Sequence, residues 1–216
     1  MKGMTVRRWV RLLGVIVLVA VVAAVPVIRT SMLRAAGRSL VVDEPLEPVD
    51  VIVLPIWAGG AGAIEAADLV HSGIAGRVAL LTEPSKPAEY ELARRGVSYA
   101  NENARVIQLL GALGISNVEV IPDPAAGTEA EGDVLLSWCD QRQFRSIVVL
   151  SSPDHSRRVR RVLRRSLRNH STKVIVRSTR YSSFDPESWW RTRDSLRTEI
   201  VELQKLLFDV VRHPLS

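Results

Sequence analysis

The stretch from Ser146 to Arg161, SIVVLSSPDHSRRVRR, constrains the fold more than any other part of the chain. Residues 147–150 form a short apolar run rich in β-branched residues, which is typical of a strand buried on both faces of a parallel sheet. Pro153 suits the first position of a helix that has Ser152 as its N-cap. The stretch therefore predicts a strand, a polar turn and a helix N-terminus, an arrangement that attracts anions in open α/β sheets.

Apolar strands alternate with helical segments along most of the chain. We expect strands at 49–54, 78–81, 118–121, 146–150 and 173–176, with helices at 64–72, 88–95, 101–113, 129–139 and 186–212. Apolar residues recur every three or four positions in the last helix, at Leu196, Ile200, Leu203, Leu207 and Val210 or Val211. This order predicts an α/β fold, a Rossmann-like three-layer sandwich with a mostly parallel five-stranded sheet.

The N-terminal region contains a long apolar run. From Leu12 to Ile28 every residue is apolar or glycine, and Trp9 extends the run toward the N-terminus. That length can just cross a bilayer core of ~30 Å. We interpret residues 9–28 as one uncleaved transmembrane helix, a signal anchor that follows a basic tail at 1–8 and precedes the α/β fold.

Two alternatives for this run remain open, a cleaved signal peptide with its site near residues 22–24 and a helix of the protein core. Basic residues before the run slightly outnumber those after it. The positive-inside rule therefore favours a single-pass protein of the cell membrane with an extracytoplasmic C-terminal domain. A cytoplasm-facing domain that binds S-adenosylmethionine or a nucleotide requires the opposite orientation.

Residues 29–48 are expected to form a juxtamembrane linker, because Pro45 and Pro48 discourage regular structure. The α/β domain then covers residues 49–216. The single Cys139 excludes an internal disulfide framework. The net charge is +6, mostly from arginine, and on a membrane-tethered chain we expect anionic lipid rather than nucleic acid as its counterpart.

His155 and Arg158 are the strongest site candidates, because both lie in the first turn of the helix that follows the fourth expected strand. Histidine can act as an acid, a base or a neutral hydrogen-bonding group, so His155 is the catalytic candidate. The guanidinium of Arg158 suits a phosphate or a carboxylate. We expect most of the other arginines of this helix to lie on a solvated face.

Other candidates follow the remaining strands. The loop around Gly59 and Gly60 is either a flexible turn or a phosphate cradle, although it matches no standard phosphate-binding motif. Thr128 has the spacing of a capping box with Glu131. The ligand-binding set that we predict comprises Gly59, Gly60, Thr82, Thr128, Glu131, Ser151, Ser152, His155 and Arg158. The scattered histidines indicate no metal site, and the sequence assigns no cofactor.

Several segments, taken in order, resemble the bacterial SanA/ElyC/YdcF family. They are VDVIVL, AIEAADLVHSG, GTEAEG with Thr128 and Glu131, SSPDHSRRV with His155 and Arg158, and WWRTRDSLRTEIVELQK with Trp190, Arg193, Glu202 and Lys205. The chain departs from that family at Gly62, where the family usually has an arginine, and at residues 82–85, where it usually has a Ser-Gly-rich turn.

The resemblance implies a Rossmann-like fold and a role in cell-envelope integrity or in the assembly of peptidoglycan or polysaccharide. It also implies S-adenosylmethionine as one ligand to consider. We therefore expect a membrane-anchored envelope protein whose α/β domain binds an anion, such as a phosphate-bearing envelope precursor or a nucleotide-like molecule. The alternative is a non-catalytic envelope scaffold that binds anionic lipid or an acidic partner through its basic helix. Whether the chain is an enzyme stays open at this point.

Overall fold

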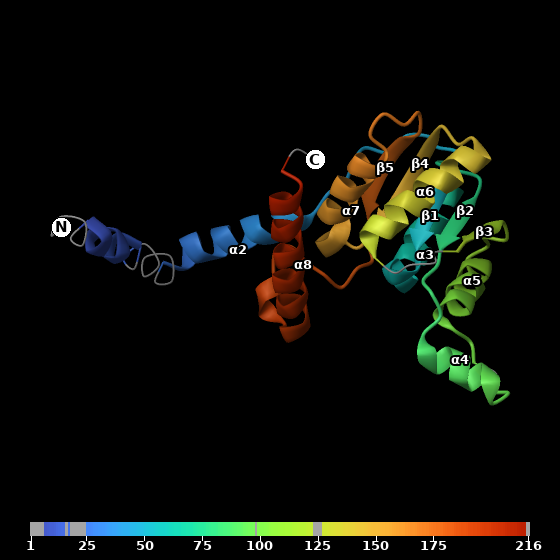
Figure 1. Ribbon diagram of the computed structural model, residues 1–216, viewed down its shortest axis with the longest axis horizontal. Coiled ribbons are helices and arrows are strands. Elements are labelled where there is room, and N and C mark those ends of the chain that lie inside the picture. Colours follow the sequence, from blue (N-terminus) through green and yellow to red (C-terminus); the bar gives the residue numbers. More distant parts are fainter. Residues whose placement is uncertain (1–6, 16, 18–24, 98, 123–126, 215–216) are drawn as a thin grey trace.

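The computed structural model describes residues 7–15, 17, 25–97, 99–122 and 127–214. Its centre is a five-stranded sheet in the order β3-β2-β1-β4-β5, with every neighbouring pair parallel (Figure 1). The strands are β1 (Val51–Pro55), β2 (Val78–Leu81), β3 (Val118–Ile121), β4 (Ser146–Ser151) and β5 (Lys173–Ser178). The predicted α/β fold with a parallel five-stranded sheet is confirmed.

Helices cover both faces of the sheet, which gives three layers. The helices are α2 (Pro26–Leu40), α3 (Gly59–His71), α4 (Pro87–Arg94), α5 (Glu102–Ala112), α6 (Thr128–Arg142), α7 (Pro153–Ser166) and α8 (Arg193–Arg212). Residues 7–15 and 17 are also helical, and short 3-10 helices cover Ile56–Ala58 and Trp189–Arg191. Helices α3 and α5 lie on one face, whereas α6 and α7 lie on the other.

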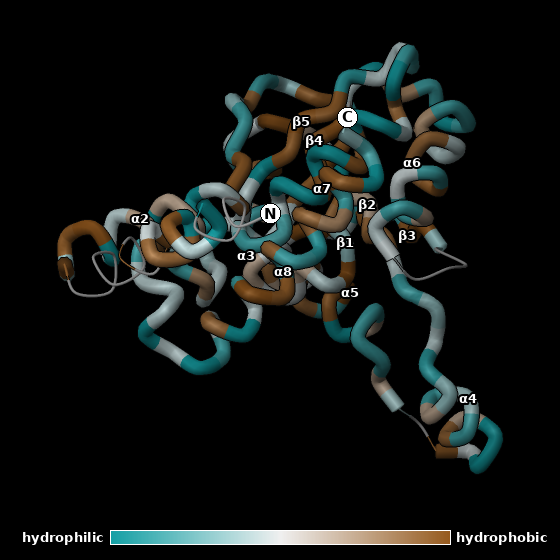
Figure 2. Tube along the Cα trace, turned by 60° about the vertical axis from the view of Figure 1, so that its left-hand side comes forward, coloured by the Kyte–Doolittle hydropathy of each residue, from teal (hydrophilic) through white to brown (hydrophobic). Residues whose placement is uncertain are grey.

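Strand β1 shows why both layers form. Its side chains alternate between the faces, so Ile52 and Leu54 pack toward α3 and α5 while Val51 and Val53 pack toward α6 and α7. All of these residues are fully buried, and Figure 2 shows the central strands as hydrophobic segments. A strand buried on both faces requires a continuous apolar run, which is what the sequence contains.

The site region lies beside β1, where the order in which successive strands join the sheet reverses. Strand β1 pairs with β2 on one side and with β4 on the other. The connections after β1 and after β4 therefore leave neighbouring strands toward opposite layers, which is the position where ligands bind in open α/β sheets. Residues 56–59 follow β1 there, and Ser152 and Pro153 follow β4.

The predicted linker at 29–48 is partly helical, which corrects the expectation of an irregular segment. Helix α2 begins at Pro26, which suits a first helical position, and it ends at Leu40 before either of the later prolines. Residues 41–47 then run along β5, where the backbone N–H of Glu44 donates to the carbonyl of Val176 at 3.1 Å. The segment is thus packed on the α/β unit.

Part of the predicted transmembrane segment at 9–28 lies outside the described residues, namely residues 16 and 18–24. Residues 26–28 belong to α2. Among the residues that the structure describes, none of the helices combines the length and the apolar character that crossing a bilayer requires.

The loop expected around Gly59 and Gly60 is helical instead. A 3-10 helix at 56–58 leads directly into α3, so Gly60 and Gly62 lie in the first turn of a helix. A Cβ atom on Gly62 would lie 2.5 Å from Cδ1 of Leu54 and 2.7 Å from Cβ of Ala58. Glycine at position 62 therefore permits close packing of α3 on β1.

The expected helix at 186–212 divides into two elements. Residues 189–191 form a 3-10 helix, and α8 begins at Arg193 after Thr192, whose hydroxyl accepts a hydrogen bond from the N–H of Ser195 at 3.2 Å. This side-chain cap fixes the helix start. The Trp189 indole donates to the carbonyl of Leu33 at 2.7 Å, which ties the 3-10 helix before α8 to α2.

Candidate functional site

His155 lies at the centre of a buried polar network between α6, α7 and α8. Its Nδ1 atom is 3.0 Å from Oε2 of Glu202, and its Nε2 atom is 3.4 Å from the Thr128 hydroxyl. His155, Glu202 and Thr128 are each at least nine-tenths buried. When Nδ1 donates to the carboxylate, Nε2 is left as an acceptor that faces the hydroxyl, which is the orientation of a general base.

Arg158 completes this network from the next turn of α7. Its Nη1 donates to the Thr128 hydroxyl at 2.7 Å, and its Nε donates to Glu202 at 3.2 Å. Its Nη2 lies 3.0 Å from Nδ1 of His155. Hydrogen bonds to Thr128 and Glu202 thus hold the guanidinium, so an anion would have to displace one of these side chains to bind Arg158.

Burial and charge set the protonation of the pair. Burial lowers the pKa of His155 below its usual value, because the hydrogen bond to Glu202 only partly opposes the loss of water, and the Arg158 cation lowers it further. Burial alone would raise the pKa of Glu202, but hydrogen bonds from His155 and Lys205 and the charge of Arg158 outweigh it and lower the value to about 2. The arrangement is therefore a neutral imidazole held by a carboxylate.

Trp57 connects this network to the crevice. Its ring meets the His155 ring edge-on, with centroids 4.6 Å apart, and its Nε1 donates to Glu131 at 3.0 Å. Thr128 and Glu131 were expected to cap α6, yet Gly127 holds the cap position and both side chains bind other partners. The capping role is therefore wrong, because tertiary partners compete for the same oxygen atoms.

A pocket of about 500 Å³ opens beside Trp57, over the ends of β1 and β2. Gly59 borders it from the first turn of α3, a turn that is fully described and contains no acidic residue. The other polar and aromatic residues that line it are Glu83, Lys86, Glu89, Tyr99, Asn101, Glu102 and Asn103. Such a mixture of hydrogen-bonding groups and aromatic rings suits a polar organic ligand.

The remaining predicted residues do not line this pocket. Thr82 is buried, and its hydroxyl donates to the carbonyl of Ile121 at 3.2 Å. Ser151 is fully buried and donates to the carbonyl of Ser152 at 3.0 Å. Ser152 holds the predicted N-cap position of α7, but its side chain makes no capping hydrogen bond. Gly60 lies in α3, where an added Cβ would approach Leu109 at 3.8 Å.

Most arginines of α7 are paired instead of forming the solvated face that the sequence suggests, although Arg164 is exposed. Arg161 donates to Asp209 at 2.6 Å, Arg160 pairs with Glu44, and Arg157 donates to the carbonyl of Ser39 at 2.8 Å. Helix α7 contacts both α2 and α8 and lies on the sheet side of them (Figure 1), so its polar side is covered by acidic and carbonyl oxygens. The helical periodicity of the sequence predicts that these side chains face solvent, but contacts with residues far away in the sequence cover them.

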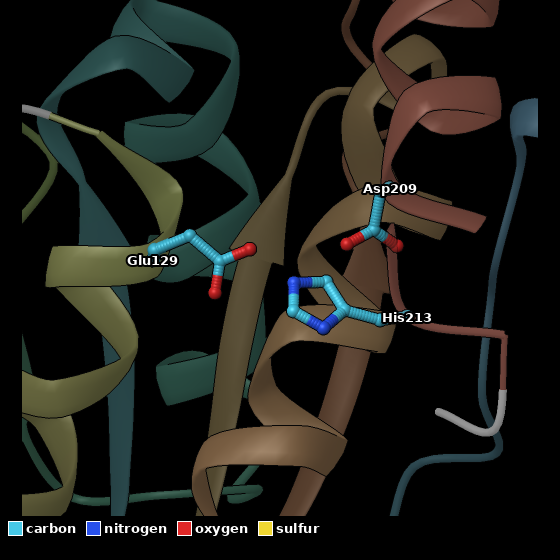
Figure 3. Close-up of side chains that lie close together, drawn as sticks. All are labelled: Glu129, Asp209 and His213. Atoms are coloured by element: carbon cyan, nitrogen blue, oxygen red, sulfur yellow. The ribbon is translucent and has the colours of Figure 1, made fainter. Parts of the chain in front are cut away.

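A second cluster joins Glu129, Asp209 and His213, whose potential ligand atoms all lie within 4.8 Å of one another (Figure 3). Both carboxylates already pair with arginines, since Arg165 contacts Asp209 at 3.0 Å and also binds Glu129, and Arg161 contacts Asp209 at 2.6 Å. Two guanidinium groups neutralise these acids and would repel a metal cation. We interpret the cluster as an ion-pair junction between α6, α7 and α8.

Glu199 lies on the buried side of α8, and its carboxyl group has fewer hydrogen bonds than those of Glu202 and Asp209. It is fully buried on α8, and neither carboxylate oxygen has a hydrogen-bond partner among the described residues. Burial and the nearby charge of Asp154 raise the pKa of Glu199 to about 7. Burial also raises the pKa of Asp154, in the first turn of α7. Two protonatable carboxyl groups therefore lie close to the His155 network.

Three residues of the observed network were not among the site residues predicted from the sequence, namely Trp57, Glu202 and Lys205. Lys205 donates to Glu202 at 2.7 Å and supplies a second cation to that carboxylate. The resemblance matched Glu202 and Lys205 in the terminal helix, which was the available signal. The other signal was an aromatic residue two positions after a strand, as at Trp57.

The chain matches no protein-family model, and no curated protein matches it significantly. Among solved structures it is similar to a universal stress protein in complex with cAMP, with a TM-score of 0.37 and 16% identity over 62% of this chain and 99% of that chain. It is also similar to the reductase domain of the aureusimine biosynthetic cluster, with a TM-score of 0.30 and 11% identity over 68% of this chain and 54% of that chain.

Proposed function

We propose that this chain is a membrane-anchored cell-envelope protein whose α/β unit binds a phosphate-bearing, hydroxyl-rich ligand of the kind used in peptidoglycan or polysaccharide assembly. The observation that carries the proposal is the pocket at the end of β1, bordered by the first turn of α3 and by Lys86. Helix N-termini and ammonium groups both favour negative charge. The anionic group of the ligand belongs at this end of the pocket.

The other residues that line the pocket favour a ligand whose remaining part is polar and rich in hydroxyl groups. Glu83, Glu89 and Glu102 outnumber Lys86 in the pocket, so a ligand with several negative charges would be repelled. Carboxylate and asparagine oxygens accept hydrogen bonds from hydroxyl groups. Trp57 and Tyr99 offer apolar ring surfaces. One phosphate on a sugar-like body meets all of these requirements.

His155 takes part through Trp57 in this proposal. The indole lines the pocket on one side and meets His155 on the other. Glu202 holds the imidazole, and Thr128 faces its Nε2 atom. The network can position Trp57 for the ligand, because Glu202 and Thr128 fix the ring against which the indole packs.

The binding test is calorimetric titration of the full chain with a hexose phosphate and with the same hexose lacking phosphate. Lys86→Gln should weaken phosphate-dependent binding by about tenfold, the order expected for one charge-assisted hydrogen bond. Lys173→Gln, far from the pocket at the start of β5, is the matched control and should bind as the parent chain does. Equal binding of both sugars, or an equal loss in both variants, would contradict the site.

The anchor in the proposal is the apolar run at residues 9–28. The described part of its helical start exposes large apolar side chains, with Trp9 72% and Leu13 64% accessible. Reporter fusions at Ser216 test the orientation. Alkaline phosphatase activity without fluorescence of a cytoplasmic reporter is expected for an extracytoplasmic domain. The reverse pattern would favour the cytoplasm-facing alternative, with S-adenosylmethionine or a nucleotide as ligand.

A further inference from the structure

Helix α8 is inverted relative to an ordinary amphipathic helix. Its buried side contains acidic residues, because Glu199, Glu202 and Asp209 all face the interior of the protein. Apolar residues lie on the outside at helical spacing. This outer face consists of Leu196, Ile200, Leu207, Phe208 and Val211, which are 38%, 45%, 65%, 65% and 72% accessible. An apolar stripe normally marks the side of a helix that is covered.

The arginine-rich helix α7 explains the inversion. Arg158 holds Glu202, and Arg161 and Arg165 hold Asp209, so α8 packs on α7 through ion pairs rather than through its apolar residues. Buried charges are tolerated when they are paired and hydrogen-bonded. The apolar stripe of α8 is thereby left at the surface.

The charges around the outer face are basic. Arg193, Arg197 and Arg212 are exposed on α8. Across α8, all of which the structure describes, the exposed acidic residue is Asp194, since the other acids are buried against α7. Apolar residues bordered by arginines are the signature of a helix that lies in the interface of an anionic membrane.

Helix α2 extends this surface. The Trp189 indole, in the 3-10 helix before α8, donates to the carbonyl of Leu33, and the Arg38 guanidinium pairs with Glu187. The sequence of α2 contains no acidic residue, and Val27 and Met32 are 73% and 55% accessible. Figure 1 shows α8 running across the direction of α2, on the side of the sheet from which the N-terminal part of the chain extends.

We propose that the outer face of α8 docks on the surface of a membrane rich in anionic lipid, with its apolar side chains in the headgroup region and its arginines against lipid phosphates. A second copy of the chain fits this face less well. A two-fold dimer would bring the face against itself and place arginines opposite arginines. The docking rests on contacts different from those of the ligand pocket, and it orients the pocket relative to the membrane.

The test measures how deeply α8 enters the lipid. The full chain is reconstituted with vesicles of phosphatidylcholine, with or without phosphatidylglycerol, after Leu207→Cys or Tyr90→Cys is labelled with an environment-sensitive fluorophore. Tyr90 on α4 is the control because it is as exposed as Leu207, at 66% against 65%, but lies at another end of the molecule. Burial raises the pKa of the native Cys139 thiol to about 11, so the introduced cysteine takes the label.

On anionic vesicles we expect the label at position 207 to shift to the blue and to be quenched by brominated lipid, while the label at position 90 remains in water. High salt should reverse the shift. Adding Arg193→Gln and Arg197→Gln should weaken this docking by about fivefold per arginine.

Identical emission from both positions on anionic vesicles overturns the proposal. A blue shift at position 207 without vesicles also overturns it, because another part of the chain or a second copy then covers the face. If the chain stays bound to vesicles in high salt while the label at position 207 is in water on anionic vesicles at low salt, the result supports the membrane anchor and contradicts the docking of α8. The anchor and the docking are thus tested separately.

Discussion

Nδ1 of His155 lies 3.0 Å from Oε2 of Glu202, across the interface between α7 and α8. The two residues are separated by 47 positions in the sequence and belong to helices on the same side of the sheet. The contact places a titratable ring, a carboxylate and the Arg158 guanidinium in one buried volume. Its energy and its pH dependence can be tested in the whole protein.

Removing the carboxylate should destabilise the fold strongly. Glu202→Ala leaves Arg158 and Lys205 without their shared partner, and an uncompensated buried charge costs about 3–5 kcal/mol in the free energy of unfolding. Glu202→Gln retains an acceptor for His155 and should cost less. Urea unfolding followed by circular dichroism measures both. Glu91→Ala, which removes an exposed partner of Arg94 and Arg95, is the control and should leave the urea midpoint nearly unchanged.

The stability of the protein should fall in acid because of the same carboxylate. The pKa of Glu202 is about 2 in the folded protein and 4.5 without these contacts, so the unfolded chain binds its proton first as the pH decreases. The contribution is complete above pH 4.5 and is lost between pH 4.5 and 2. It amounts to about 3 kcal/mol. Urea midpoints measured across this range should show a flatter profile for Glu202→Gln than for the parent chain.

Glu199 should act in the opposite direction at higher pH. Its pKa is raised from 4.5 to about 7, so the folded protein retains a proton that the unfolded chain has released. Stability should therefore decrease as the pH rises from 4.5 through 7. Glu199→Gln cannot ionise, and relative to the parent chain it should gain about 2–3 kcal/mol between the two ends of this range. A constant difference between the two proteins at every pH would contradict the assignment.

Close packing at Gly62 should make an added methyl group costly. Gly62→Ala places a Cβ 2.5 Å from a methyl group of Leu54, and overpacking of this kind costs about 1–3 kcal/mol. Gly111 in α5 is the matched helical control, because a Cβ there would have no described neighbour within 4 Å outside its own helix backbone. Gly111→Ala should stabilise the protein by about 0.5–1 kcal/mol through helix propensity. Thermal unfolding of both variants separates the two effects.

The candidate site could be predicted only in part. His155, Arg158 and Thr128 were selected because they lie near helix starts after strands, and the structure brings these three together. Their position followed from local pattern and from the crevice rule for α/β sheets. Glu202 could not be assigned as the partner of His155 from spacing, because nothing local specifies which side of α8 meets α7.

The sequence by itself determined the sheet. Strands at 78–81 and 118–121 have the predicted bounds. The run at 78–81 is apolar and fully buried, as expected for a strand inside a parallel sheet covered on both faces. The tertiary structure alone decided the orientation of α8. Its apolar period marks a helix, but the arginines of α7 attract the acidic side of that helix, and their ion pairs outweigh burial of the apolar stripe. Local periodicity does not encode a long-range charge pairing of this kind.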